Sequence, residues 1–174
     1  MSAKKSKPEI ITFQARLDAF RFLGIEQIVT PASDFGAVWD HYFKTAEGSG
    51  CSAYDYIIWY YKNNAQMYFV GKVAHGAGEV PEGFSLVKFP ACEYLVVTHE
   101  WLPADANLYE NGILLTQNYV GIGQTHVYRE DIPVPDGYVR YDGPDSPITQ
   151  IEIENTNDRG ESRFERWVPI KRKE

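Results

Sequence analysis

Residues 54–71 constrain the fold most, because they predict a β-hairpin that is apolar on both faces. Seven aromatic residues fall in these eighteen positions, and a polar bend at 62–64 divides the segment into two strands. Side chains alternate along a strand. One face of the first strand therefore carries Tyr54, Tyr56, Ile58 and Tyr60, and the other carries Ile57, Trp59 and Tyr61. A hairpin with one wet face alternates apolar with polar residues, so we expect the protein's own helix to cover one face and more protein or a ligand to cover the other.

The composition narrows the class of protein. At 174 residues, the chain can bury a core as one domain or two small ones. The net charge of -7 argues against a direct nucleic-acid partner, since phosphate binding uses Lys and Arg, and it favours a cationic ligand.

Residues 1–8 lack a signal-peptide core, and no apolar run reaches the roughly 18 residues that span a bilayer. Cys51 and Cys92 form no paired motif, which is typical of free thiols in the cytosol. We therefore expect a cytoplasmic protein with no membrane partner.

The hydrophobic pattern predicts an α+β fold made of two strand-helix-strand-strand modules. In the first module, a strand at 24–29 precedes a helix at 31–46, which Ser33 or Asp34 caps and which ends at 48–50, and the aromatic hairpin follows. The expected elements of the second module are strands at 84–89 and 91–99, a helix at 103–120, a loop at 127–143 with strand character at 138–141, and strands at 148–154 and 164–171.

These elements predict one domain over residues 9–171, with halves at about 9–83 and 84–171. Residues 1–8 are expected to be a disordered tail, and residues 172–174 a short one. Two such halves side by side, with an antiparallel sheet, would enclose a central aromatic cleft, which is a common place for a ligand pocket.

Four short segments resemble a known family when they are taken in order. They are the helix segment 37–43 around Trp39, the strand 68–71 ending in Gly71, the turn at 80–83 with the following strand start at 89–94, and the closing strand 165–170. In these segments the chain resembles the GyrI-like small-molecule-binding family, also called the AraC-type effector-binding domain, over about residues 9–171. The resemblance implies paired strand-helix-strand-strand modules around an aromatic pocket. It also implies lipophilic, often cationic, ligands, and some close relatives hydrolyse cyclopropane-bearing natural products.

The same resemblance implies two candidate acids. The family often has a pocket glutamate in a Phe-Glu-x-Tyr strand and another that opens the last strand. Glu152 and Glu165 match these two positions at the same interval, whereas Glu154 stands where the family has an aromatic residue. Cys92 replaces a usual glycine, and we take it as a tolerated small residue.

Each candidate has a structural alternative. Trp39, Trp59, Tyr60 and Tyr68 either stack on a ligand, since a ring face attracts a cation by about 0.5–2 kcal/mol, or belong to the core. Glu165 shares a strand face with Trp167 and either meets a bound cation or pairs with Arg163 or Arg166. Glu152 shares its face with Gln150 and Glu154, which is the pattern of a solvated face.

Other motifs predict no cofactor and no metal site. His41, His75, His99 and His126 lack ligand spacing, so structural or surface roles are expected. Neither cysteine has a recognisable catalytic partner. The Gly121-Ile122-Gly123 segment lacks the third glycine and the preceding parallel strand of a dinucleotide site.

Three functions follow as hypotheses. The first is a stand-alone small-molecule-binding protein for lipophilic, cationic or planar compounds, without the helix-turn-helix module that transcriptional relatives carry before this domain. The second is a hydrolase of strained rings, in which Glu152 or Glu165 acts with a tyrosine. The third is a protein-binding inhibitor, such as a gyrase modulator, with a functional surface in the loop 127–143.

Overall fold

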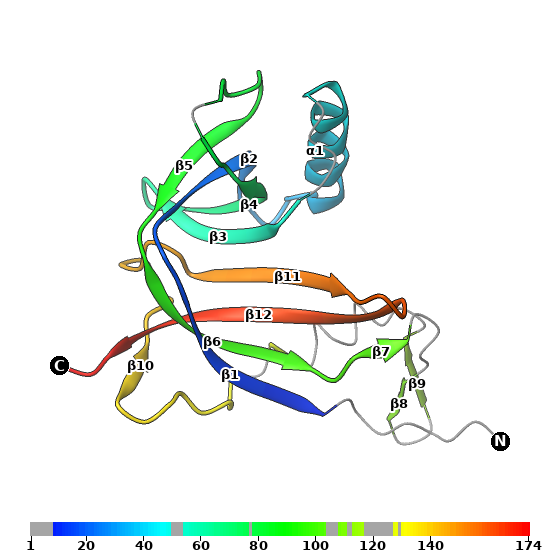
Figure 1. The fold of residues 1–174 in the computed structure, drawn as a ribbon, viewed down its shortest axis with the longest axis vertical. Coiled ribbons are helices and arrows are strands. Elements are labelled where there is room, and N and C mark those ends of the chain that lie inside the picture. The colour runs from blue at the N-terminus through cyan, green and yellow to red at the C-terminus, as the bar shows by residue number, and fades with distance from the viewer. Residues whose placement is uncertain are drawn as a thin grey trace.

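The computed structural model describes residues 9–49, 54–76, 78–103, 108–110, 113–116, 127–128 and 130–174. Most of them belong to one ten-stranded sheet with the strand order β1-β6-β12-β11-β3-β4-β2-β5, in which β7 and β10 pair with β12 (Figure 1). The strands of this sheet are β1 (Ile10–Leu17), β2 (Phe20–Ile28), β3 (Tyr56–Lys62), β4 (Ala65–Val73), β5 (Ser85–Phe89), β6 (Cys92–His99), β7 (Leu102–Pro103), β10 (Tyr138–Arg140), β11 (Gln150–Thr156) and β12 (Glu161–Arg172). The paired strands are antiparallel, and with one helix in the described part the fold is α+β, as predicted.

One long antiparallel ribbon joins the two halves of the sheet. β1 pairs with β6 from Ile10 to Leu17, and β2 pairs with β5 from Phe20 to Gly24. The pairing keeps the same register across the bend at residues 18–19 and 90–91. Figure 1 shows the ribbon running from the upper half of the molecule, with β2–β5 and α1, to the lower half, with β1, β6 and β12. The first and last strands of the order, β1 and β5, both belong to this ribbon. The sheet therefore folds back on itself around a core.

The strand order is symmetric about the pairing of β3 with β11. Each strand of the first half has a counterpart at the same distance from this pairing in the second half. The counterparts are β1 and β5, β2 and β6, β3 and β11, and β4 and β12. Ile58 pairs with Ile151 at the centre. The neighbouring registers then make Trp59 the counterpart of Glu152, and Tyr68 the counterpart of Arg166. This pairing does not conflict with the predicted two-module architecture.

The helix α1 (Phe35–Ser49) begins directly after its cap. The Ala37 N–H donates to Asp34 Oδ1 at 3.1 Å, so Asp34 rather than Ser33 caps the first turn. The helix starts later than predicted because the Ser33 N–H bonds to the Thr30 carbonyl at 3.0 Å in a turn. The helix was expected to end at residues 48–50. This prediction is wrong for residues 48 and 49, which are still helical.

The predicted second helix at 103–120 is wrong wherever the structure describes it. β8 (Leu108–Glu110) and β9 (Ile113–Thr116) form a separate two-stranded sheet there. The run Ile113-Leu114-Leu115 is apolar but has no helical spacing, so its pattern is compatible with a strand as well as with a helix. The rest of this prediction lies outside the described residues.

Three clusters of buried residues form the core, and two of them cover the two faces of the aromatic hairpin. Ile58 and Tyr60 belong to the cluster enclosed by the folded sheet, which also packs Tyr56. Ile57 and Trp59 face the cluster beneath α1. A third cluster, around Phe164, Val168 and Ile170, covers the outer face of the second half. The two faces of β3 are therefore assigned as predicted.

Tyr54 departs from the predicted alternation, because β3 begins only at Tyr56. Its ring packs at the α1 side, with its centroid 4.7 Å from that of Trp39. Among the residues that the structure describes, no helix is long and apolar enough to cross a bilayer.

Candidate functional site

The sheet separates the seven candidate residues into three places. Trp39, Trp59, Tyr68 and Glu152 lie on the side of the sheet that faces α1. Glu165 and Trp167 lie on the opposite face and line a cleft between the two halves. Tyr60 lies in the enclosed core, where its hydroxyl donates to Glu26.

The aromatic residues on the α1 side form one connected group. The Trp59 and Tyr68 rings are paired across β3 and β4, with centroids 5.0 Å apart in an edge-to-face arrangement. Phe35, from the first turn of α1, contacts both of them. The Trp39 Nε1–H donates to the Tyr68 hydroxyl at 3.0 Å, which fixes the ring of Tyr68 against the helix. The group presents aromatic surface immediately beside β11.

Glu152 is the acid of this group, and it is only 4% exposed. It pairs with Ile57 of β3 on one side and Arg166 of β12 on the other. The interpretation of 150, 152 and 154 as a solvated face is therefore wrong at Glu152. Burial raises the pKa of Glu152 to about 7, and the nearby Trp59 N–H and the Arg166 charge lower it only in part.

The donors around Glu152 are neutral. Gln150 Nε2 donates to Glu152 Oε1 at 2.6 Å. The Trp59 indole nitrogen is buried and has no partner within hydrogen-bonding geometry in the described part of the chain, although it lies close enough to affect the Glu152 carboxylate. A buried carboxylate beside an unsatisfied indole N–H is a costly arrangement unless something else enters the site.

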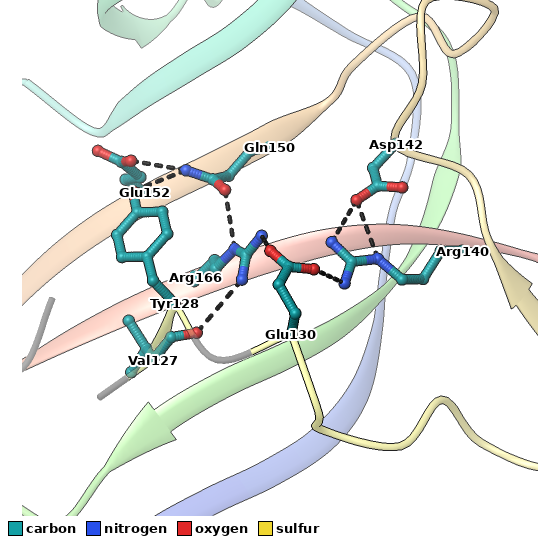
Figure 2. Close-up of polar contacts among 8 residues, drawn as sticks. All are labelled: Val127, Tyr128, Glu130, Arg140, Asp142, Gln150, Glu152 and Arg166. Carbon is teal, nitrogen blue, oxygen red and sulfur yellow. Dashed lines mark hydrogen bonds and ion pairs between the residues drawn. The ribbon is translucent and has the colours of Figure 1, made fainter. Parts of the chain in front are cut away.

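Gln150 connects Glu152 to a charged network at the surface (Figure 2). Its Oε1 accepts from Arg166 Nε at 2.8 Å, and its Nε2 also donates to the Tyr128 hydroxyl at 2.7 Å. Arg166 lies over the Tyr128 ring, 4.9 Å from its centroid, and pairs with Glu130 at 3.4 Å. Two further side chains extend the network outward. They are Arg140, which pairs with Glu130, and Asp142, which accepts from Arg140.

A pocket of about 320 Å³ opens above this network. Trp59, Gln150 and Tyr128 contribute to its wall, and the charged residues form its rim. Glu152 is not among the residues that line this pocket, and it is linked to the lining through the Gln150 side chain, which hydrogen-bonds both Glu152 and Tyr128. Tyr128, Arg140 and Gln150 were not predicted as ligand-binding residues, because they come from a loop and two strands that meet only in the folded protein.

Glu165 is also 4% exposed, but its oxygens are already bonded. Oε1 accepts from Arg163 Nη2 at 2.9 Å, and Oε2 accepts from Trp167 Nε1 at 2.8 Å. The alternative in which Glu165 pairs with Arg163 therefore holds in the structure. The two glutamates differ in kind: Glu165 is an ion-paired acid that positions a tryptophan, whereas Glu152 has neutral donors.

The histidine and cysteine residues that the structure describes form no comparable site. His99 is buried, with Nε2 accepting from the Phe164 N–H at 3.0 Å and Nδ1 2.7 Å from the Glu100 carbonyl, so its role is structural. Cys92 is buried with a pKa raised chiefly by burial, which makes a poor nucleophile. Cys51 and His126 lie outside the described residues. Within the described ranges no group of three or more His, Cys, Asp or Glu side chains could hold a metal ion.

The fold is similar to those of solved structures. No family model and no curated protein matches the chain. The structure of SAV2435 bound to tetraphenylphosphonium matches with a TM-score of 0.58 and 11% identity, over 92% of this chain and 94% of that one. An integron cassette protein, VCH_CASS2, from the mobile metagenome of Vibrio cholerae matches with a TM-score of 0.54 and 10% identity, over 92% and 95%.

Another similar structure is a complex with DNA. The EcmrR–DNA complex has a TM-score of 0.51 and 16% identity, over 94% of this chain and 58% of that one. These likenesses fit the GyrI-like effector-binding fold that the sequence motifs predict. At identities this low they establish the fold alone.

Proposed function

We propose that this protein binds lipophilic cations on the α1 side of the sheet, with Glu152 as the charge-neutralising acid. Trp59, Tyr68 and Trp39 supply the aromatic surface on which such a ligand stacks. The observation that carries the proposal is the state of Glu152, a carboxylate buried among aromatic rings with neutral hydrogen-bond donors. Removing a carboxylate from water without a cation beside it costs several kcal/mol, and a bound cation offsets that cost.

The ligand enters through the pocket lined by Trp59, Gln150 and Tyr128. The Gln150 amide occupies the position beside Glu152 that a positive charge would take, and a ligand displaces it outward. Arg166 and the Tyr128 hydroxyl, which hold Gln150 in the free protein, then keep it at the rim. The match to a structure with bound tetraphenylphosphonium supports a ligand of this class.

A strained-ring hydrolase is the second candidate. Its support is the pKa of Glu152 near 7, which suits a general base, together with the Tyr128 hydroxyl that Gln150 bridges to the same carboxylate. Incubation with a cyclopropane-bearing compound, followed by mass spectrometry for addition of water, tests it. Turnover that Glu152→Gln abolishes supports the hydrolase, and binding without turnover rejects it for that compound.

Calorimetric titration with tetraphenylphosphonium tests the binding function. This cation has no titratable group, so the pH dependence of its affinity reports the protein. Because only ionised Glu152 attracts it, affinity should be roughly tenfold weaker at pH 6 than at pH 8 for a pKa of about 7. The uncharged triphenylphosphine oxide should bind much more weakly at both pH values.

Two matched variants locate the acid. Glu152→Gln keeps the hydrogen-bond acceptor and removes the charge, so it should weaken binding at least tenfold and flatten its pH dependence. Glu165→Gln makes the same change on the opposite face and should leave the affinity within about twofold. If Glu165→Gln abolishes binding and Glu152→Gln does not, the proposed location is wrong.

A further inference from the structure

A further pocket, of about 280 Å³, lies at the β5 edge of the first half, where the sheet order ends (Figure 1). Its walls come from β2, the end of β4, β5 and the connection between β4 and β5. In the described part of the chain, it shares no lining residue with the pocket beside Gln150. Arg21 and residues 73–75 also border the cleft between the two halves, so they form the wall between that cleft and this pocket. The pocket is therefore separate from the binding site proposed above.

Part of the pocket lining is aliphatic. Leu23 pairs with Leu86 of β5 and with Lys72 of β4, so these three side chains share one face of the sheet. Val80, from the connection after β4, adds to the lining. Leu86 is 39% exposed and Val80 is 43% exposed, and large apolar side chains that gather at a hollow indicate a binding site. The described lining contains no Phe, Tyr or Trp, so it fits an aliphatic chain rather than a planar ring.

The same lining carries two positive charges. Arg21 and Lys72 are both half-buried. Arg21 donates to the Gly76 carbonyl, which holds the guanidinium at the pocket wall. Among the described residues, neither Arg21 nor Lys72 takes part in an ion pair. Asp55, beside the end of β4, instead accepts from the Val73 N–H at 2.8 Å.

The other charged groups near the pocket leave it basic. Glu79 is the acid of the described lining, and it is exposed and forms no ion pair with a described residue. Asp18, at the bend of the ribbon, pairs with Arg16 at 3.7 Å. Lys88 lies directly opposite Arg21 on β5, and like charges in this position repel each other. An anion bound at Arg21 would offset that repulsion.

We propose that this pocket binds an aliphatic carboxylate, with the carboxylate on Arg21 and Lys72 and the chain against the aliphatic lining. A guanidinium binds a carboxylate through two parallel N–H···O hydrogen bonds, which fixes the orientation of the ligand. A volume of 280 Å³ corresponds to roughly nine non-hydrogen atoms, at about 30 Å³ for each water-sized group. Octanoate is about that size, and it is the probe.

Calorimetric titration with sodium octanoate, below the concentration at which it forms micelles, tests the proposal. We expect saturable binding at one site. Acetate has the same charge without the chain, and octanamide has the same chain without the charge. Each should bind at least tenfold more weakly than octanoate, because each lacks one of the two contacts. Equal affinity for acetate would overturn the role of the chain, and equal affinity for octanamide would overturn the role of the charge.

Two pairs of variants locate the site. Arg21→Gln removes the guanidinium and should weaken octanoate binding at least tenfold. Lys88→Gln removes the basic group opposite Arg21 but outside the pocket lining, and should change the affinity by less than about threefold. Leu86→Glu places a carboxylate at an exposed position of the aliphatic lining and should also weaken binding at least tenfold. Ile28→Glu makes the same change of charge at an exposed position outside the lining and should have no effect beyond about twofold.

The absence of octanoate binding to the wild-type protein would overturn the site, and so would unchanged binding in Leu86→Glu. If Trp167→Leu abolishes binding while Leu86→Glu does not, octanoate occupies the cleft between the halves and the proposed location is wrong. The proposal does not depend on the cation site. Glu152→Gln should therefore leave octanoate affinity within about twofold, and excess octanoate should not displace tetraphenylphosphonium.

Discussion

Glu152 and Trp59 occupy equivalent positions about the pairing of β3 with β11, but their side chains differ in chemistry. The pairing of β3 with β11 relates Trp59 to Glu152, and the outer pairings relate Tyr68 to Arg166. The first half thus contributes two aromatic rings at this central position, and the second half contributes two charged side chains there. Each cross-strand pair is a natural contact in an antiparallel sheet. The central site is asymmetric although its backbone is nearly symmetric.

The pKa of Glu152 makes the stability of the free protein depend on pH. Folding raises this pKa from its ordinary value of 4.5 to about 7, so the folded protein binds the proton more tightly than the unfolded chain. The free energy of unfolding therefore falls as pH rises through this window, and the full cost is present above pH 7. At about 1.4 kcal/mol per pKa unit, the cost is roughly 3 kcal/mol.

Glu152→Gln removes that cost while keeping the acceptor for Gln150. The variant should be roughly 2–3 kcal/mol more stable than the wild type at pH 8 and nearly equal to it at pH 4.5. Urea unfolding of both proteins at the two pH values measures the difference. A stability difference that is the same at both pH values would show that Glu152 does not titrate between them.

The sequence could identify Glu152 only through its resemblance to a family. Gln150, Glu152 and Glu154 alternate with Ile151 and Ile153, and this pattern by itself indicates a solvated face. The structure buries Glu152 between Ile57 of β3 and Arg166 of β12, beside Trp59, and none of these contacts is local in the sequence. Glu165 was easier to assign, since its alternation with Trp167 already placed both on one face. Its pairing with Arg163, two residues away, also follows from the same alternation.

At the level of single elements, strands were predicted better than helices. Period-two patterns located β5 and β6 to within a residue, and the polar bend at 62–64 marks the observed turn. Asn63 and Asn64 both have positive φ there, which asparagine tolerates. The failure at 103–120 came from a run with apolar residues but no period. The folding-back of the sheet was invisible, since it depends on pairing between residues as distant as Ile10 and His99.

The glycine near the end of β4 has a clear structural reason. Gly71 pairs with Gly24 of β2, and a Cβ on Gly71 would lie 2.2 Å from the Leu23 carbonyl oxygen. The obstructing atoms are backbone, so they cannot move aside without breaking the β2–β4 pairing. Gly71→Ala should therefore lower the free energy of unfolding by about 2–4 kcal/mol.

Gly143→Ala is the matched control, because a Cβ there meets nothing within 4 Å and the residue does not have positive φ. It should change stability by no more than about 0.5 kcal/mol. Denaturant unfolding of both variants measures the contrast. Equal effects at the two positions would mean that the close approach of β2 and β4 does not limit the side chain at Gly71.

In the molecule as a whole, the two halves are joined by more than the short contact of β3 with β11. That contact spans only three residue pairs. The ribbon of β1–β2 with β5–β6 crosses from one half to the other in one register, and the enclosed core draws Phe22 and Phe69 from one half and Tyr94 and Ile151 from the other. Unfolding either half would expose part of that shared core. We therefore expect one cooperative unfolding transition rather than two.

Tryptophan variants test this expectation, because two tryptophans lie in each half. A protein with Trp101→Phe and Trp167→Phe reports the first half through Trp39 and Trp59. Adding Val168→Ala, which truncates a side chain in the core of the second half, should destabilise that reporter protein by about 1–3 kcal/mol. If the halves unfold together, the fluorescence midpoint of the first half falls as far as the midpoint seen by circular dichroism. If the fluorescence midpoint stays in place while circular dichroism shows an earlier transition, the ribbon does not couple the two halves. A ligand bound in one half would then leave the stability of the other half unchanged.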